Sequence, residues 1–302
     1  MKSILSIGHA AYDITISVDD YPKENLKYRV DNKVECGGGP ASNAAYLTAK
    51  WGLKTYFAGV VGDDLYGHKI EEEVKNIGVD TTYLQKNSEH STTNSFILAN
   101  RKNGSRTIFS YRPSMMKMEN IDFNIEPKLI IVDGQEPEIS KKAFEQFPNA
   151  IKVIDAGRDK PEVIELCHMV DYVACSKDFA ENVTNIKINY TYTNSIVEAY
   201  KKLKEMFNTN IIITLEDKGC VYENNGNIKI MPSIKVKSVD STGAGDIFHG
   251  GLAYALASDF DIEKAVKYAN IAGALSVEKV GGRFSIPDLK DVEEKYEQYK
   301  WL

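Results

Sequence analysis

Short apolar runs alternate along this chain with segments of helical pattern, and that alternation restricts the fold to a layered arrangement. The apolar, partly β-branched runs are Ile4–Ile7, Thr55–Val61, Leu129–Val132, Lys152–Ile154, Tyr172–Ala174 and Ile211–Leu215. Runs of this kind are typical of strands covered on both faces, as in a parallel sheet. Helical patterns lie between them, at Ala41–Trp51, Gly67–Ile77, Ser140–Phe147 and Ser195–Met206. The order predicts βαβ units in a layered α/β fold.

Two other regions show the polar and apolar alternation of half-exposed strands. Residues 12–35 form the first, and residues 92–112, with the runs Thr92–Asn100 and Arg106–Tyr111, form the second. Between those runs, Asn103-Gly104 is a strong hairpin signal. We therefore expect a small antiparallel sheet that stands off the main sheet as a lid over a site. No linker-like stretch separates it from the body, so residues 1–302 are interpreted as one domain.

Composition and charge exclude several classes of function. The formal net charge is −6 and no basic stripe is visible, which argues against nucleic acid as a partner. No run approaches the roughly 18 apolar residues that span a bilayer, and the first apolar run is too short for a signal peptide. The four cysteines are scattered without a CxxC pair, as expected of reduced thiols in a cytoplasmic protein with no membrane partner.

The segment Asp240-Ser-Thr-Gly-Ala-Gly-Asp246 carries the strongest chemical signal. It lies between a β-like stretch and a small apolar helical stretch, Ile234–Val239 and Ile247–Ala257. Gly243 and Gly245 would leave backbone N–H groups free at a helix N-terminus, where such groups bind phosphate. Asp246, in the first turn, would stay ionised and act as a general base for an incoming hydroxyl. The alternative is a tight turn in which Asp246 only caps the helix.

A second glycine-rich segment, Gly37-Gly-Gly-Pro-Ala-Ser-Asn43, also opens a helix. Glycine permits close approach of a ligand to the backbone, and the Asn43 amide offers a donor and an acceptor for a hydroxyl. An ordinary loop before a helix would have the same pattern. Common nucleotide-binding motifs explain neither segment, because the Walker A pattern does not occur in the chain and Phe248 stands where a third Rossmann glycine is required.

Together, in this order, the two segments resemble the signatures of the PfkB or ribokinase-like family of carbohydrate kinases. Gly38-Gly39…Asn43 is similar to the N-terminal signature and Asp240…Gly243-Ala-Gly-Asp246 to the C-terminal one. Further similarity lies in Gly8…Asp13, Gly59–Gly67, Thr214…Gly219 and Gly281…Pro287. The resemblance implies a ribokinase-like three-layer α/β/α fold with a mostly parallel central sheet and a small β-sheet lid. It also implies an ATP-dependent carbohydrate kinase, a phosphotransferase with an alcohol group as acceptor.

The resemblance further implies roles for individual residues. Asp246 is the expected catalytic base, and the anion hole for the γ-phosphoryl group is expected at Gly243, Ala244 and Gly245. The expected substrate-binding residues are Asp13, Gly38, Gly39, Asn43 and Asp246. The expected ATP-binding residues are Thr214, Gly219, Gly243, Gly245 and Asn270, with Mg²⁺ held mostly by phosphate and water. Asp240 and Thr242 resemble the start of a monovalent-cation site for K⁺.

Other candidate residues have a structural alternative. Asn270 lies in the helical stretch Ala265–Val277, where an ordinary surface residue would fit the same pattern. The histidines, including His249, show no metal-binding spacing and are interpreted as structural or surface residues. Arg106 and Arg112 flank a lid strand, where they either solubilise the lid or meet a phosphate or other acidic group of the substrate.

The chain departs from the family at Ser176-Lys-Asp-Phe-Ala-Glu181. Many members carry Asn-x-x-Glu there, linked to metal and phosphate, where this chain has Ser176 and Phe179. The Ser-Lys-Asp stretch is similar to ketohexokinase-like members, so a fructose-type ketohexose is the expected substrate. Ribose, a nucleoside, and a homologue that binds sugar or nucleotide without turnover are the alternatives. An exposed lid edge also predicts a homodimer that pairs two lids.

Overall fold

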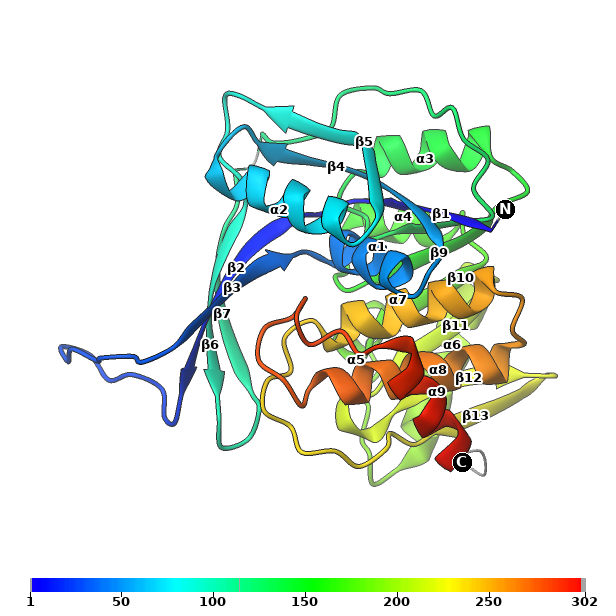
Figure 1. The fold of residues 1–302 in the computed structure, drawn as a ribbon. Helices are drawn as coiled ribbons and strands as arrows, with labels where there is room; N and C mark the ends of the chain where they lie inside the picture. The colour runs from blue at the N-terminus through cyan, green and yellow to red at the C-terminus, as the bar shows by residue number, and fades with distance from the viewer. Residues whose placement is uncertain (1, 114, 300–302) are drawn as a thin grey trace.

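A nine-stranded sheet forms the centre of the structure, a computed structural model that describes residues 2–113 and 115–299 (Figure 1). In spatial order its strands are β13 (Asn227–Met231), β12 (Cys220–Asn224), β11 (Asn210–Thr214), β10 (Tyr172–Ser176), β9 (Ile151–Ala156), β8 (Leu129–Val132), β1 (Ser3–Ile7), β4 (Lys54–Gly62) and β5 (Val79–Asn87). Neighbours from β11 to β5 pair in parallel, whereas β12 and β13 run antiparallel. The prediction of a mostly parallel sheet is confirmed.

Helices cover both faces of this sheet, as a three-layer fold requires. One face packs against α1 (Pro40–Lys50), α7 (Ala244–Ala257), α8 (Ile262–Ser276) and α9 (Leu289–Gln298). The other packs against α3 (Pro137–Gln146), α4 (Pro161–Cys167), α5 (Lys177–Thr184) and α6 (Thr193–Phe207). Successive residues of β1 enter opposite layers, Ile4 the first and Leu5 the second. A central strand such as β8 is apolar throughout because neither of its faces meets water, whereas the edge strands β5 and β13 carry polar, partly exposed residues.

The lid is a separate four-stranded sheet, visible at the left of Figure 1. Its strands, in spatial order, are β3 (Lys33–Gly38), β2 (Ala11–Val18), β6 (Asn94–Asn100) and β7 (Arg106–Tyr111). The predicted hairpin at Asn103-Gly104 is confirmed, since it joins the antiparallel pair β6 and β7. A third cluster of apolar side chains, which includes residues of α1 and α2 (Leu65–Asn76), packs against β2 and β4 and anchors the lid to the body.

Two predictions about strands were wrong. The lid is not wholly antiparallel, because β2 and β6 pair in parallel. The chain returns to the main sheet through β4, α2 and β5 between β3 and β6, and it re-enters the lid in the direction of β2. The predicted strand at Ile234–Val239 forms no sheet ladder. Its apolar residues Ile234 and Val236 pack on the core instead, which explains the alternating pattern.

Two further observations concern features that the composition predicts. The four cysteines, Cys36, Cys167, Cys175 and Cys220, are buried free thiols, as expected. Within residues 2–113 and 115–299, no helix has the length and apolar character needed to cross a membrane. The remaining short element is a 3-10 turn, Glu216–Lys218, between β11 and β12.

Candidate active site

The glycine-rich segment before α7 ends in an open cradle of backbone N–H groups. Gly243 is the N-cap residue with φ 76°, and the helix begins at Ala244 without a side-chain cap. In the described part of the chain, no acceptor bonds the N–H groups of Gly245 or Asp246. A Cβ atom on Gly245 would meet nothing within 4 Å. The cradle therefore fits a phosphate group, which would satisfy both donors at the positive end of the helix dipole.

Asp246 lies in the first turn of α7 and faces the other glycine-rich segment. Asn43 Nδ2, from α1, donates a hydrogen bond of 2.8 Å to Asp246 Oδ2. Burial and the negative charge of Asp155 raise the pKa of Asp246 to about 7, against the hydrogen bond from Asn43 and the charge of His249. The expectation of a fully ionised carboxylate is therefore corrected, because burial outweighs the helix dipole. A base with this pKa is matched to proton transfer near neutral pH.

A buried Asp–His pair, which the sequence interpretation missed, acts on Asp246. His249 Nδ1 lies 2.7 Å from Asp155 Oδ2, and both side chains are almost fully buried. Burial lowers the pKa of His249, but Asp155 outweighs that effect and raises it. His249 is thus structural, as interpreted, yet it also balances the charge behind Asp246. Its place in an otherwise small and apolar helix was the available signal, because an isolated histidine there is buried.

A second missed feature is Arg283, whose side chain is fully buried. Its Nε donates to Asn43 Oδ1 at 3.3 Å, and its Nη2 donates to Ser42 Oγ at 2.5 Å. Its Nη1 lies 3.1 Å from Glu73 Oε2. Arg283 therefore holds the acceptor side of the Asn43 amide, so that the donor side points at Asp246. The Gly281-Gly-Arg motif was noted in the sequence, but an arginine after two glycines usually lies in an exposed loop.

The residues of the expected sugar cradle lie together at the base of the lid. Asp13 is buried in β2, and a Cβ atom on Gly38 would come within 2.1 Å of its Oδ2. Gly39 has φ 93°, and a Cβ there would come within 2.5 Å of the His9 carbonyl oxygen. Burial raises the pKa of Asp13 to about 6, against the positive charge of Arg283. These close contacts require glycine at both positions, so the backbone of this segment lies directly against the Asp13 carboxyl and the His9 carbonyl oxygen.

Asp240 and Thr242 hold the loop before α7. Asp240 accepts hydrogen bonds of 2.9 Å from the N–H groups of Thr242 and Gly281, one on each oxygen. The carbonyl oxygen of Val277 accepts from the N–H groups of Val239 and Asp240. Thr242 Oγ1 is buried and has no hydrogen-bond partner within the described residues. Asp240 thus has a structural role in shaping the cradle.

Of the expected ATP-binding residues outside the phosphate cradle, Gly219 and Asn270 lie against the same segment, at the end of β13. A Cβ on Gly219 would come within 1.9 Å of the Met231 carbonyl oxygen, and Asn270 Nδ2 donates to the Pro232 carbonyl oxygen at 2.8 Å. Asn270 is buried, so it is not an ordinary surface residue. Thr214, at the end of β11, instead donates to the Cys175 carbonyl oxygen at 3.3 Å.

The residues that stand where the family has its Asn-x-x-Glu motif have a structural role in this chain. Ser176 caps α5 by accepting from the N–H of Phe179 at 3.1 Å. Phe179 is buried in the core. Within residues 2–113 and 115–299, no group of three or more histidine, cysteine or acidic residues could hold a metal ion. Residues 176 and 179 therefore offer no ligands for Mg²⁺, which would have to be held mostly by phosphate and water.

The lid hairpin closes onto the loop before α7. The Ser241 N–H donates to the Gly104 carbonyl oxygen at 3.1 Å, and Arg106 Nη1 donates to Ser241 Oγ at 2.9 Å. Gly104 has φ 70°, and a Cβ there would come within 2.1 Å of Ser238 Oγ. The tip of the lid therefore docks beside the phosphate cradle, while the base of the lid carries Asp13.

Known proteins resemble this chain over nearly its whole length. The profile of "pfkB family carbohydrate kinase" matches residues 1–289. The chain is 25% identical over 308 residues to a nucleoside kinase of Methanocaldococcus jannaschii, with 99% of this chain and 98% of the relative covered. It is 26% identical over 308 residues to a ribokinase of Haemophilus influenzae, with 97% and 98% covered.

Solved structures of ribokinases have the same fold. The ribokinase of Thermotoga maritima matches with a TM-score of 0.81 at 27% identity, covering 98% of this chain and 100% of the other. The ribokinase of Arabidopsis thaliana, complexed with ribose and ATP, matches with a TM-score of 0.79 at 22% identity, covering 97% and 99%. Because the family profile spans nearly all of the sequence, this chain belongs to the pfkB family of carbohydrate kinases.

Proposed function

We propose that the chain transfers the γ-phosphoryl group of ATP to a sugar hydroxyl, with Asp246 as the general base. The observation that carries this proposal is the 2.8 Å hydrogen bond between Asn43 and Asp246. It joins the segment proposed to bind the sugar to the helix N-terminus proposed to bind phosphate. A carboxylate with a pKa of about 7 beside an open phosphate cradle has the properties that this reaction requires.

The proposed reaction is an in-line displacement. Asp246 accepts the proton of the sugar hydroxyl while the hydroxyl oxygen forms a bond to the γ-phosphorus and the bond to the ADP oxygen breaks. The N–H groups of the predicted anion hole, Gly243, Ala244 and Gly245, stabilise the charge on the transferring oxygens, although in the structure the Ala244 N–H donates to the Ser241 carbonyl oxygen at 3.4 Å. The closed lid excludes water, which would otherwise accept the phosphoryl group. Mg²⁺ would be held mostly by the phosphates of ATP and by water, where it would neutralise phosphate charge.

The rest of the nucleotide is proposed to lie along Thr214, Gly219 and Asn270. The shared contact of Gly219 and Asn270 with the segment after β13 supports a common wall. K⁺ beside Asp240 and Thr242 also stays a prediction. The unpartnered Thr242 Oγ1 favours it, whereas the Val277 carbonyl oxygen already accepts two hydrogen bonds.

The identity of the sugar is the most specific part of the proposal. The fructose preference rests on resemblance in the Ser176-Lys-Asp stretch, the Gly104-Ser-Arg-Thr107 turn and the Gly37–Asn43 segment, and Ser176 caps α5 in the structure. Ribose and nucleosides are supported by the names of the relatives. Asp13 and Asn43, which bond hydroxyl groups equally well in a free sugar or a nucleoside ribose, accommodate each of them.

A homodimer through the lid is proposed from its exposed edge. Every residue of β7 is exposed, and it forms the edge of the lid sheet. Phe96 and Phe109 form a cross-strand pair on its outer face, 49% and 60% exposed. An apolar edge strand of this kind favours pairing with a second copy. Light scattering at micromolar concentration tests the dimer, and a monomer would contradict it. A cytoplasmic location remains a prediction from the cysteines.

The experiment that tests the proposed function is release of ADP from ATP and Mg²⁺ with a panel of sugars and nucleosides. Sugar-dependent release, with the phosphorylated product identified by mass spectrometry, supports the kinase. No release above background with any member would favour the alternative, a homologue that binds without turnover.

A further inference from the structure

Cationic side chains gather beside the proposed sugar cradle, at the carboxyl ends of three neighbouring strands. Strands β9, β8 and β1 are adjacent and parallel. The cations Arg158 and Lys160 follow β9, and the uncharged imidazole of His9 follows β1. The lid contributes Arg112, one residue beyond β7. Ligands of open α/β sheets bind at this edge, so the cluster lies where substrate is expected.

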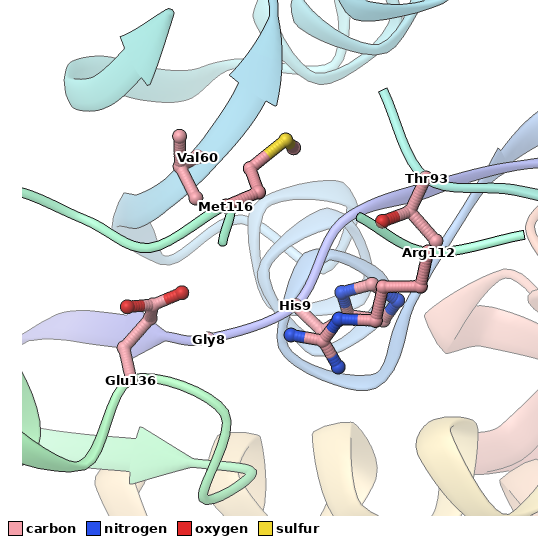
Figure 2. Close-up of a pocket in the computed structure, with 7 residues that line it drawn as sticks. All are labelled: Gly8, His9, Val60, Thr93, Arg112, Met116 and Glu136. Carbon is pink, nitrogen blue, oxygen red and sulfur yellow. The ribbon is translucent and has the colours of Figure 1, made fainter. Parts of the chain in front are cut away.

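The cluster borders a small cavity, shown in Figure 2. Gly8, His9, Thr93, Arg112 and Glu136 are among its lining residues, and its volume is about 10 Å³, enough for one water molecule. In Figure 2, the Arg112 guanidinium and the His9 imidazole lie close together on the side of the cavity away from Glu136. The cavity is therefore polar and carries a cation on its wall.

Arg112 lies on the face of the lid that carries Asp13. The strand register places Asp13 beside Ser95, and Ser95 beside Ser110, in one row across the sheet. Alternate residues of a strand point to the same face, so Arg106, Ser110 and, by continuation, Arg112 share the face of Asp13. One face of the lid thus carries the hydroxyl-binding carboxylate with an arginine toward either end.

Three cations of the cluster, Arg112, Arg158 and Lys160, have no carboxylate partner within ion-pair distance in the described part of the chain. Arg112 Nη1 donates to Gln135 Oε1, which leaves other donors of its guanidinium. Arg158 and Lys160 are exposed. Burial lowers the pKa of Arg112, which is the sign of a guanidinium removed from water without full compensation. An anion would supply that compensation.

The nearby carboxyl groups are committed to the backbone. Asp133 accepts from the N–H groups of His9 at 2.8 Å, Gln135 at 2.9 Å and Ala41 at 3.2 Å. Glu136 accepts from the N–H of Met118 at 3.0 Å, and burial raises its pKa to about 7.

His9 adds no positive charge to the three cations. Burial and then the charges of Arg112, Arg158 and Lys160 lower the pKa of His9 to about 3, so it is neutral at pH 7. Arg112, Arg158 and Lys160 thus lie close enough to His9 to lower its pKa, and the acidic groups nearby are Asp133, Asp155, Asp159 and Glu136. Within the described residues none of these carboxylates forms an ion pair with the three cations, and Asp155 pairs with His249 instead.

We infer that the sugar substrate carries an anionic group, a carboxylate, phosphate or sulfonate, which Arg112 binds directly while Arg158 and Lys160 add long-range attraction. This inference rests on the proposed function, because it concerns the far end of the same substrate. Asp246 would receive the hydroxyl at one end, and Arg112 would bind the anion at the other. A guanidinium fork is suited to a carboxylate, phosphate or sulfonate through paired N–H donors.

The test compares matched sugars in the ADP-release assay with the full-length protein. Pairs such as gluconate and glucose, fructose 6-phosphate and fructose, or ribose 5-phosphate and ribose differ in the anionic group, and they distinguish carboxylate from phosphate. We expect the charged member of at least one pair to exceed its neutral partner about 100-fold in kcat/KM. Its KM should also rise with salt concentration, because screening weakens the attraction.

Variants assign the effect to the cluster. Arg112→Gln should lower kcat/KM about 100-fold for the charged sugar, mostly through KM, and change the neutral partner less than about 3-fold. Arg112→Lys should restore part of the loss. Arg158→Gln, an exposed change that leaves the fold intact, should lower kcat/KM for the charged sugar by about 10-fold. Arg101→Gln, on a lid arginine paired with Asp19, is the matched control and should have no effect.

The outcomes separate this inference from the proposed function. No ADP release with any charged sugar, neutral sugar or nucleoside would remove the proposed function itself. Kinase activity with a neutral sugar or nucleoside as the best substrate would overturn the anionic substrate while the kinase stands. An equal loss of kcat/KM for the charged and the neutral member of a pair in Arg112→Gln would also overturn the anionic substrate. A thermal melt of each variant by circular dichroism shows whether it is folded, and Arg158→Gln decides the question if Arg112→Gln unfolds.

Discussion

Asn43 on α1 donates to Asp246 on α7, and Arg283 donates to the other side of the same amide. The amide is therefore held in one orientation, with its N–H group toward the proposed base. Hydrogen bonding to an ionised carboxylate favours that form, so Asn43 lowers the pKa that burial and Asp155 raise. The two glycine-rich segments of the sequence meet at this one contact.

Asn43→Ala should move the pH dependence of the reaction. With a pKa of about 7 for Asp246, kcat/KM of the wild type should rise with pH through about 7 as the base loses its proton. Loss of the Asn43 donor raises that pKa further, so the rise should move to higher pH. A pH profile from 5.5 to 9 measures it. A rise that stays in place, or moves to lower pH, would remove Asn43 as a partner of the ionised base.

Arg283→Met should destabilise the protein and weaken catalysis together. The change removes the cation that pairs with Glu73, which keeps only the Gly37 N–H, and it removes one of the two groups that orient the Asn43 amide. Breaking a buried charge pair costs about 3 kcal/mol. Urea denaturation measures the loss, and Arg101→Gln, in an exposed pair, should cost less than about 1 kcal/mol. If Arg283→Met were as stable as the control variant, Arg283 would not be what holds the site together.

Gly104→Ala should prevent the lid tip from docking. A Cβ there would lie 2.1 Å from Ser238 Oγ, in a left-handed conformation with φ 70°. We expect kcat/KM to fall about 10-fold, because an open lid admits water and loses the Arg106 contact. Gly226→Ala is the matched control, since Gly226 has φ 76° with nothing within 4 Å. Equal effects of the two changes would mean that backbone strain, and not lid docking, is responsible.

Asp13→Ala should raise the KM for the sugar about 100-fold while the KM for ATP changes little. The carboxyl lies in the lid row with Ser95, beside Gly38, and would bond sugar hydroxyls in the ground state. Steady-state kinetics with each substrate varied in turn separate the two constants. A parallel rise in both would show that the sugar site is wrongly placed.

Most of the fold could be predicted because its signals are local. Apolar strands and helical patterns determine the parallel layers, and Asn103-Gly104 specifies a hairpin by its backbone preference alone. The direction of β2 relative to β6 could not be predicted, because it depends on the path of the chain between them. The strand predicted at residues 234–239 was wrong for a related reason. Alternation of polar and apolar residues indicates that one side of a segment is buried, but not that a neighbouring strand is present to pair with it.

The site was predictable only in part. Asp246 at a helix N-terminus followed from its neighbours in sequence, and the roles of Asp13 and Asn43 followed from the family resemblance. Arg283 and the pair of Asp155 with His249 could not be identified, because their partners lie far away in the chain. The raised pKa of Asp246 has the same origin, since it depends on burial and on the charge of Asp155.

The most direct test of the account is turnover of Asp246→Asn with the best sugar found in the panel. The variant keeps the size of the side chain but removes the base, so kcat should fall by about 1,000-fold or more with the KM for ATP nearly unchanged. Asp261→Asn is the matched control, because Asp261 accepts from the N–H of Lys264 at 2.9 Å and only caps α8. Turnover of Asp246→Asn at the rate of the wild type would contradict the assignment of Asp246 as the base.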